Sequence, residues 1–145
     1  MIPITQELIK EIADNMLTGC RCYVHTETGQ LIAIPDDDVY ESDLKELFAD
    51  DLKELKKNKK FYKELDKPES RDSFEFMVNF TEQLSDDNPL KHRLALVLEM
   101  KSPFSNFNHQ IDNSGEYRQQ WFTFKDEAFK QWVIDQFNRL NWPIQ

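Results

Sequence analysis

The sequence predicts an α+β fold, with a small antiparallel sheet in the first half and mainly helices in the second. A short stretch, Cys20 to Thr26, alternates apolar and polar side chains, which is typical of a half-buried strand. In the C-terminal third, aromatic residues recur in steps of three to five, close to the repeat of an α-helix. Pro89, Pro103 and Pro143 divide this half into segments of helical length. With 145 residues and no linker or repeat, we expect one domain over residues 1–145.

The first half predicts a helix followed by a hairpin. The helix runs from about Thr5 to Leu17, and Gly19 ends it. Its apolar face consists of Ile4, Leu8, Ile9, Ile12, Ala13 and Met16. The strand from Cys20 follows, Glu27-Thr28-Gly29 makes the turn, and Gln30 to Pro35 returns.

A second helix and a third strand are expected next. Ser42 is the predicted cap of this helix, and Lys56, Lys57, Lys59 and Lys60 lie at its C-terminal end, where cations are favoured. Its apolar stripe consists of Leu44, Leu47, Phe48, Leu52 and Leu55. The segment from Lys60 to Leu65 predicts the third strand.

Four more helices are expected in the second half. They begin at Ser70, at Pro89, at Phe104 and after Gly115. The helix that begins at Phe104 ends at Ile111, and the last helix ends at about Leu140. The buried side of the first is expected to hold Phe74, Met77, Val78, Thr81 and Leu84, with Phe76 and Phe80 flanking. The second carries Leu90, Leu94, Val97 and Leu98. The last carries a stripe of Tyr117, Trp121, Phe124, Ala128, Trp132, Phe137 and Leu140.

Charge and composition exclude several classes of function. The net charge is −9, from 27 acidic and 18 basic residues, so we expect no binding to nucleic acid and none to an anionic membrane surface. No signal peptide or membrane span is recognisable, and Cys20 and Cys22 are too close in the chain for an unstrained bridge. We therefore expect free thiols and a cytoplasmic protein, and leave its oligomeric state open.

Four aromatic and aliphatic motifs resemble a known family. In chain order they are residues 74–80 (Phe-Glu-Phe-Met-Val-Asn-Phe), 93–96 (Arg-Leu-Ala-Leu), 103–107 (Pro-Phe-Ser-Asn-Phe) and 121–124 (Trp-Phe-Thr-Phe). In order and spacing this pattern resembles the bacterial uncharacterised protein family 0158, over roughly residues 61 to 142, with a looser match to the hairpin. The resemblance implies no activity, cofactor or partner.

The chain departs from this family at one turn. Where many members have a Gly-rich turn followed by basic residues, this chain has Met100-Lys101-Ser102-Pro103. An anion-binding role for that turn is therefore not carried over.

We expect none of the sequence motifs for metals, cofactors or catalysis to form a site. Cys20 and Cys22 lack the two-to-four-residue spacing of structural zinc ligands, and His25 points away from both on a strand. The acidic run Asp36, Asp37, Asp38 and Glu41 lacks the alternation and glycine of a calcium loop. Three scattered glycines cannot form a phosphate-binding loop. Glu99, after an apolar run, is the nearest candidate for a carboxyl group with a raised pKa, and a helix-end charge near Lys101 or Arg93 is its simpler role.

The candidate binding residues are His109, Arg118 and Trp121. They flank the predicted break before the last helix, and Trp beside Arg is typical of a binding hot spot. The alternative, which we favour, is that Trp121 belongs to the core, because it lies within the helical stripe.

These observations lead to three hypotheses about function. The first is a small acidic protein-interaction or regulatory module without a catalytic motif. The second is an enzyme without a recognisable motif, a hydrolase that uses carboxylates. The third is an acidic mimic of nucleic acid, which requires carboxylates along one ridge.

Overall fold

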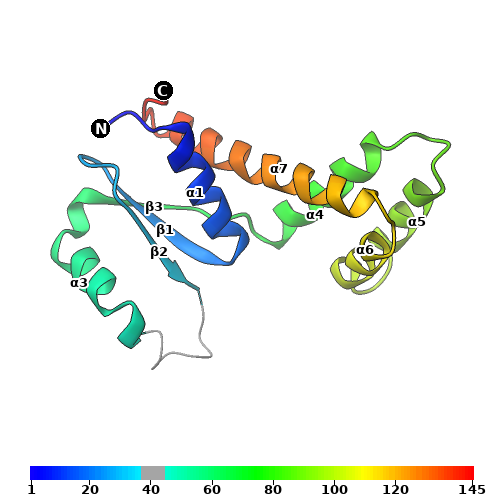
Figure 1. Cartoon of the computed structure of the whole chain (residues 1–145), viewed down its shortest axis with the longest axis horizontal. Coiled ribbons are helices and arrows are strands. Elements are labelled where there is room, and N and C mark those ends of the chain that lie inside the picture. Colours follow the sequence, from blue (N-terminus) through cyan, green and yellow to red (C-terminus); the bar gives the residue numbers. More distant parts are fainter. Residues whose placement is uncertain (37–44) are drawn as a thin grey trace. The chain divides into compact units, whose positions relative to one another are not determined.

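The computed structural model describes residues 1–36 and 45–145, and it confirms the α+β fold (Figure 1). It contains a three-stranded antiparallel sheet, and its C-terminal half is helical. By its internal contacts the chain forms two compact units. We call Met1–Lys67 with Phe129–Gln145 the sheet unit, and Pro68–Ala128 the helical unit.

Helix α1 (Gln6–Leu17) forms where the apolar spacing predicts it. The Thr5 hydroxyl accepts the N–H of Leu8 at 3.1 Å and caps the first turn. The helix buries Ile9, Ile12, Ala13 and Met16. Gly19 follows with φ +87°, a conformation that glycine adopts without steric cost.

The sheet has the order β2-β1-β3, with β1 (Cys20–His25) between β2 (Leu31–Pro35) and β3 (Tyr62–Leu65). Alternation in β1 buries Cys20, Cys22 and Val24, and the Cys22 thiol lies 3.9 Å from the Ile12 carbonyl of α1. The hairpin turn is confirmed, since Gly29 has φ +75°. The third strand is also confirmed, but its predicted first residues form the short 3₁₀ helix η1 (Lys59–Phe61).

The two ends of the chain are paired in the sheet unit (Figure 1). Ile4 donates its N–H to the Pro143 carbonyl at 2.8 Å, and Gln145 donates to the Ile4 carbonyl at 2.8 Å. The indole of Trp142 donates to the Ile2 carbonyl at 2.6 Å. Pro143 therefore follows the last helix as predicted. The neighbouring Ile144 pairs with Ile4 in an isolated parallel β-bridge.

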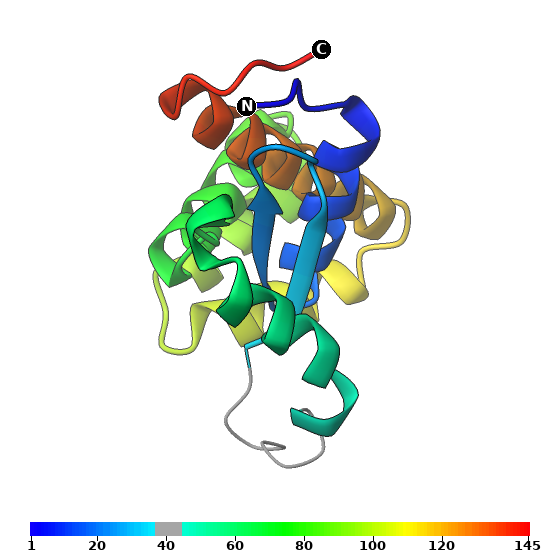
Figure 2. The same ribbon diagram turned by 90° about the vertical axis from the view of Figure 1, so that its left-hand side faces the viewer.

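Helix α3 (Ala49–Lys57) buries none of its residues. Leu47, just before it, is 76% exposed, and Leu52 is 39% exposed. The predicted cap Ser42 and the first stripe residue, Leu44, lie outside the described residues. Figures 1 and 2 show α3 and α1 on opposite sides of the hairpin. Of the described residues of the predicted stripe, Phe48 and Leu55 are half-buried, and Leu47 and Leu52 are exposed.

The helical unit contains α4 (Ser70–Gln83), α5 (Pro89–Leu98), α6 (Pro103–Asp112) and the first turns of α7 (Tyr117–Arg139). Each predicted helix is present, with ends within two residues of the prediction. Glu69 and Asp72 form a capping box at α4. Pro89 occupies the first turn of α5, where its missing N–H costs nothing.

An aromatic cluster fills the core of the helical unit. The ring of Trp121, 2% exposed, meets those of Phe80 and Phe107 edge-on at 5.3 and 5.0 Å. The prediction that Phe80 flanks this core is wrong, because Phe80 is fully buried while Phe74 and Val78 are half-buried. The buried side of α4 instead carries Met77, Phe80 and Leu84.

Of the residues predicted to form the apolar stripe of α7, Trp121 and Phe137 are buried, but others are not. Phe129 and Val133 are buried, whereas the predicted Ala128, Trp132 and Leu140 are half-buried. A single helical repeat does not fit both ends of α7, because its first turns serve one core and its later turns another. In the described part of the chain, no helix combines the length and the apolar character needed to cross a membrane.

Candidate functional site

The three candidate binding residues do not form one exposed surface. Trp121 is buried in the core of the helical unit. Arg118 is exposed, with its guanidinium 4.6 Å from the centre of the Phe122 ring and its Nε 3.4 Å from Asp112. His109 is exposed on α6. The core role of Trp121 therefore matches the structure better than a hot-spot role.

A cleft of about 340 Å³ opens in the helical unit above this core. Phe76, Met77, Phe104 and Trp121 line its apolar floor, and Glu69, Ser70, Ser73, Asn108 and Lys125 are among its polar lining. The Glu69 side chain is already used in the capping box, and the Lys125 ammonium lies 6.0 Å from the Trp121 ring. The two charged groups of this cleft therefore have contacts within the unit.

A larger cleft, of about 460 Å³, lies in the sheet unit and is lined by residues of α3, η1, β1 and β3. We call it the sheet-face cleft. It is lined by Tyr23, Leu55, Lys56, Lys59, Tyr62 and Glu64. Alternation places Tyr23 on the cleft face of β1, and the cleft side of α3 carries Leu55 and Lys56.

Two tyrosine hydroxyls form hydrogen bonds with carboxylates in or beside the sheet-face cleft. Tyr62 donates to Glu54 Oε2 at 3.0 Å, and burial together with this carboxylate raises the pKa of Tyr62 to about 12. Hydrogen bonds from Asn58 and Tyr62 lower the pKa of Glu54. Burial, and then a hydrogen bond with Glu64, raises the pKa of Tyr23. At neutral pH the cleft therefore has neutral tyrosines and a charged Glu54.

Two lysines of this cleft belong to a basic segment of a chain that is otherwise acidic. Residues 53–63, which we call the basic segment, contain six lysines and one glutamate. The lysines are Lys53, Lys56, Lys57, Lys59, Lys60 and Lys63, and all are exposed. The segment has a net charge of +5 and the rest of the chain −14, which together give −9. Among the ion pairs of the residues that the structure describes, none involves these six.

The family to which the chain belongs is shown by a family model. The model of the Uncharacterised protein family (UPF0158) matches residues 1–142. The chain is a member of UPF0158. This confirms the resemblance and extends it over both units, so both clefts lie in the UPF0158 region. Comparisons with curated proteins and with solved structures gave no match.

In this UPF0158 chain, the described residues that were candidate metal ligands make other contacts. Burial raises the pKa of the Cys22 thiol to about 12, and Cys20 is also buried and free. His25 stacks on Phe61 at 5.4 Å, and its Nδ1 accepts N–H groups of the hairpin turn. Asp36 pairs with Lys67 at 2.8 Å. Within residues 1–36 and 45–145, no three metal-ligating side chains come together, and Asp37, Asp38 and Glu41 lie outside that range.

Carboxylates of this UPF0158 chain give little support to a hydrolase. No Asp or Glu is buried in the described part of the chain. The resolved pKa shifts of Asp36, Glu54 and Asp86 are all downward, caused first by hydrogen bonds from Lys67, Asn58 and Lys91 respectively. A carboxyl group that acts as a proton donor near neutral pH needs an upward shift. Glu99 is exposed after the end of α5.

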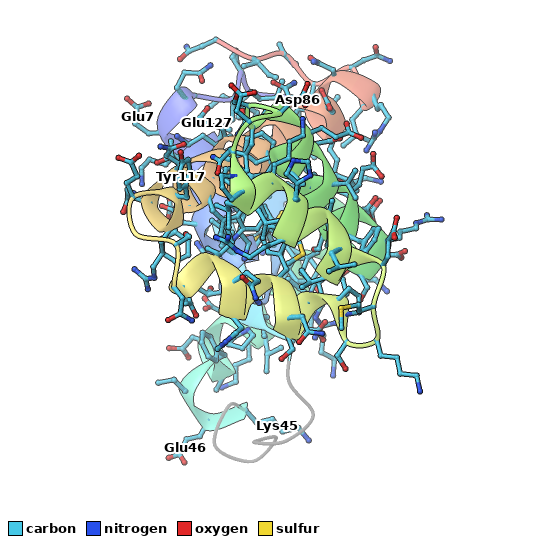
Figure 3. The ribbon with its side chains drawn as sticks, turned by 90° about the vertical axis from the view of Figure 1, so that its right-hand side faces the viewer. Glu7, Lys45, Glu46, Asp86, Tyr117 and Glu127 are labelled. Carbon is cyan, nitrogen blue, oxygen red and sulfur yellow. The ribbon has the colours of Figure 1, made fainter. Side chains whose placement is uncertain are left out.

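The acids of the described residues are spread over several helices, strands and turns. Acids labelled in Figure 3 come from separate elements, with Glu7 on α1, Asp86 between α4 and α5, and Glu127 on α7. The basic segment further interrupts the acidic surface of the sheet unit. Sequence reasoning treated four of its lysines as helix-end cations and missed the sheet-face cleft, although the clustering of charge in residues 53–63 is visible in the sequence.

Proposed function

We propose that this UPF0158 member is a protein-binding module, and that α3 with the sheet-face cleft is its binding surface. The observation that carries the proposal is the apolar stripe of α3, of which no residue is buried in the described structure. Leu47 and Leu52 are exposed by 76% and 39%, and Leu55 lines the cleft beside them. Exposed apolar residues rimmed by charged ones are typical of interaction sites.

A protein partner fits this surface better than a small substrate. The charged Glu54 and the high-pKa Tyr62 do not supply a proton acceptor and donor matched to neutral pH. An amphipathic helix beside a groove is a common peptide-binding arrangement. We also propose a cytoplasmic location, since Cys20 and Cys22 are free thiols.

The test compares two variants that place glutamate on different exposed leucines. Leu47→Glu with Leu52→Glu alters the proposed surface, and Leu96→Glu, at a residue 61% exposed on α5, is the control. Proteins captured from a native lysate of the source cells are quantified by mass spectrometry. We expect a partner that is retained by wild type and Leu96→Glu and lost with the double variant.

Equal recovery of every captured protein by all three forms would contradict the proposal. Circular dichroism and urea unfolding confirm that the double variant is folded. We expect its free energy of unfolding to lie within about 0.5 kcal/mol of wild type, because exposed positions contribute little to stability.

A further inference from the structure

We infer that the sheet-face cleft binds an acidic segment of a partner chain that carries a bulky apolar side chain. This inference rests on the proposed function and adds the chemistry of the partner. It depends on three features of the sheet unit: the charge of the basic segment, the lining of the cleft and the arrangement of nearby aromatic rings.

The charge selects an acidic partner. Lys56 and Lys59 line the cleft, and the other lysines of the basic segment extend along α3, η1 and β3. These ammonium groups form no ion pair among the described residues, so carboxylates of a partner can pair with Lys56 and Lys59 without breaking an existing ion pair. Charge complementarity of this kind also accelerates association.

The lining of the cleft adds an apolar requirement. Leu55 of α3 lines the cleft together with Tyr23 and Tyr62, and the cleft's volume of about 460 Å³ is within the usual size range of ligand clefts. Lysine stems also present methylene groups along such walls. A partner with carboxylates alone would leave these apolar walls uncovered, so the fitting segment also carries an aromatic or aliphatic side chain.

Single-stranded nucleic acid fits the same surface less well. Binding of that class uses a positive groove together with aromatic faces that are free to stack on bases. Here the rings of His25 and Phe61 stack on each other with an angle of 8° between them, and Lys60 lies over the Phe61 ring at 5.1 Å. Glu54 and Glu64 also place negative charge among the lysines, which disfavours a continuous row of phosphates.

The experiment selects short peptides from a random library displayed on phage, using immobilised full-length protein. Enriched peptides are synthesised, and their affinities are measured by fluorescence anisotropy at about 50 and 500 mM salt, where the Debye length changes from above to below ~10 Å. We expect enriched peptides to combine an excess of Asp and Glu with at least one aromatic or aliphatic residue. Their affinity is expected to fall at high salt.

Two double variants locate the binding. Lys56→Gln with Lys59→Gln removes the lysines of the cleft, and we expect the affinity to fall about tenfold because two charge pairs are lost. Arg93→Gln with Lys101→Gln removes two exposed cations from the helical unit, and we expect a change of less than about twofold.

Several results would overturn the inference. They are a neutral or basic consensus, no enrichment, or equal affinity for the Lys56/Lys59 variant. Binding of mixed-sequence single-stranded RNA that depends on Lys56 and Lys59, without peptide binding, would assign the cleft to nucleic acid instead. A lysate partner that depends on Leu47 and Leu52 but not on these lysines would leave the proposed function intact and reject only the acidic partner.

Discussion

At the scale of single residues, Cys22 shows how the fold controls a reactive group. Its thiol is fully buried between β1 and α1, and burial is the main cause that raises its pKa from 9.0 to about 12. The thiolate is the reactive form of cysteine, so this thiol is protected at neutral pH. The native protein therefore retains a proton that the unfolded chain releases.

This difference predicts a loss of stability with rising pH. Above pH 9 the unfolded chain loses the Cys22 proton while the folded chain keeps it, so the free energy of unfolding falls by up to about 1.4 kcal/mol per pH unit. Tyr23 and Tyr62, whose ordinary pKa is 10.0, add to the fall increasingly as the pH approaches 10. Urea unfolding of wild type and of Cys22→Val between pH 9 and 10 therefore separates the contribution of Cys22 from that of the tyrosines. We expect Cys22→Val to have a shallower slope there, and an unchanged slope would contradict this assignment.

Trp142 ties the end of the chain to its beginning. Its side chain is 2% exposed, its ring lies 5.2 Å from that of Phe137, and its indole N–H donates to the Ile2 carbonyl. We expect Trp142→Phe to cost about 1 kcal/mol, for the lost hydrogen bond. We expect Trp142→Ala to cost about 3–5 kcal/mol, since it also leaves a cavity. Urea unfolding measures both values, and equal costs would show that packing contributes little here.

At the scale of elements, α4 shows that two phenylalanines of one helix differ in role. Phe80 is fully buried against Trp121 and Phe124, whereas Phe76 is half-buried on the cleft of the helical unit. We expect Phe80→Ala to lower the free energy of unfolding by about 3–5 kcal/mol. The matched variant Phe76→Ala is expected to cost about 1–2 kcal/mol, because less area returns to water. The reverse order, measured by urea unfolding, would contradict the observed packing of α4.

Helix α3 illustrates the opposite case among the elements. Its apolar spacing resembles that of α1, yet α1 buries four residues and α3 buries none. Helical periodicity identifies which residues share a face, but burial depends on whether another element covers that face. In α3 the remaining apolar surface is the basis of the proposed function.

At the scale of the whole molecule, α7 belongs to both compact units. It contributes Trp121 to the core of the helical unit, and Phe129, Val133 and Phe137 to the sheet unit. Unfolding either unit would leave part of this continuous helix without its packing, and isolated short helices are marginal in water. We expect the two units to unfold in one cooperative transition, in agreement with the expectation of a single domain.

Two variants with one tryptophan each test this cooperativity. Trp132→Phe with Trp142→Phe leaves Trp121 as the probe of the helical unit, and Trp121→Phe with Trp132→Phe leaves Trp142 as the probe of the sheet unit. In urea, fluorescence and circular dichroism should give one midpoint within each variant, since coincident probes indicate two-state unfolding. Separate midpoints within a variant would show that the units unfold independently.

Much of the fold was predictable because its signals are local. Alternation in β1, the turn at Gly29, and the prolines in the first turns of α5 and α6 fix elements through backbone sterics and short-range periodicity. The family could also be recognised, since its aromatic motifs are contiguous in the chain. Of the candidate binding residues, Trp121 was correctly weighed as part of the core.

The tertiary structure alone decided which apolar faces are covered. It made Phe80 central, shifted the buried positions of α7 to Phe129 and Val133, and left Leu47 and Leu52 exposed near a cleft. None of these follows from the spacing of residues within one helix. Covering a face requires contacts between segments distant in sequence, and the free energy of those contacts depends on the position of every partner. The sequence therefore determined the elements and their order, and the folded chain determined which of their surfaces remain available for binding.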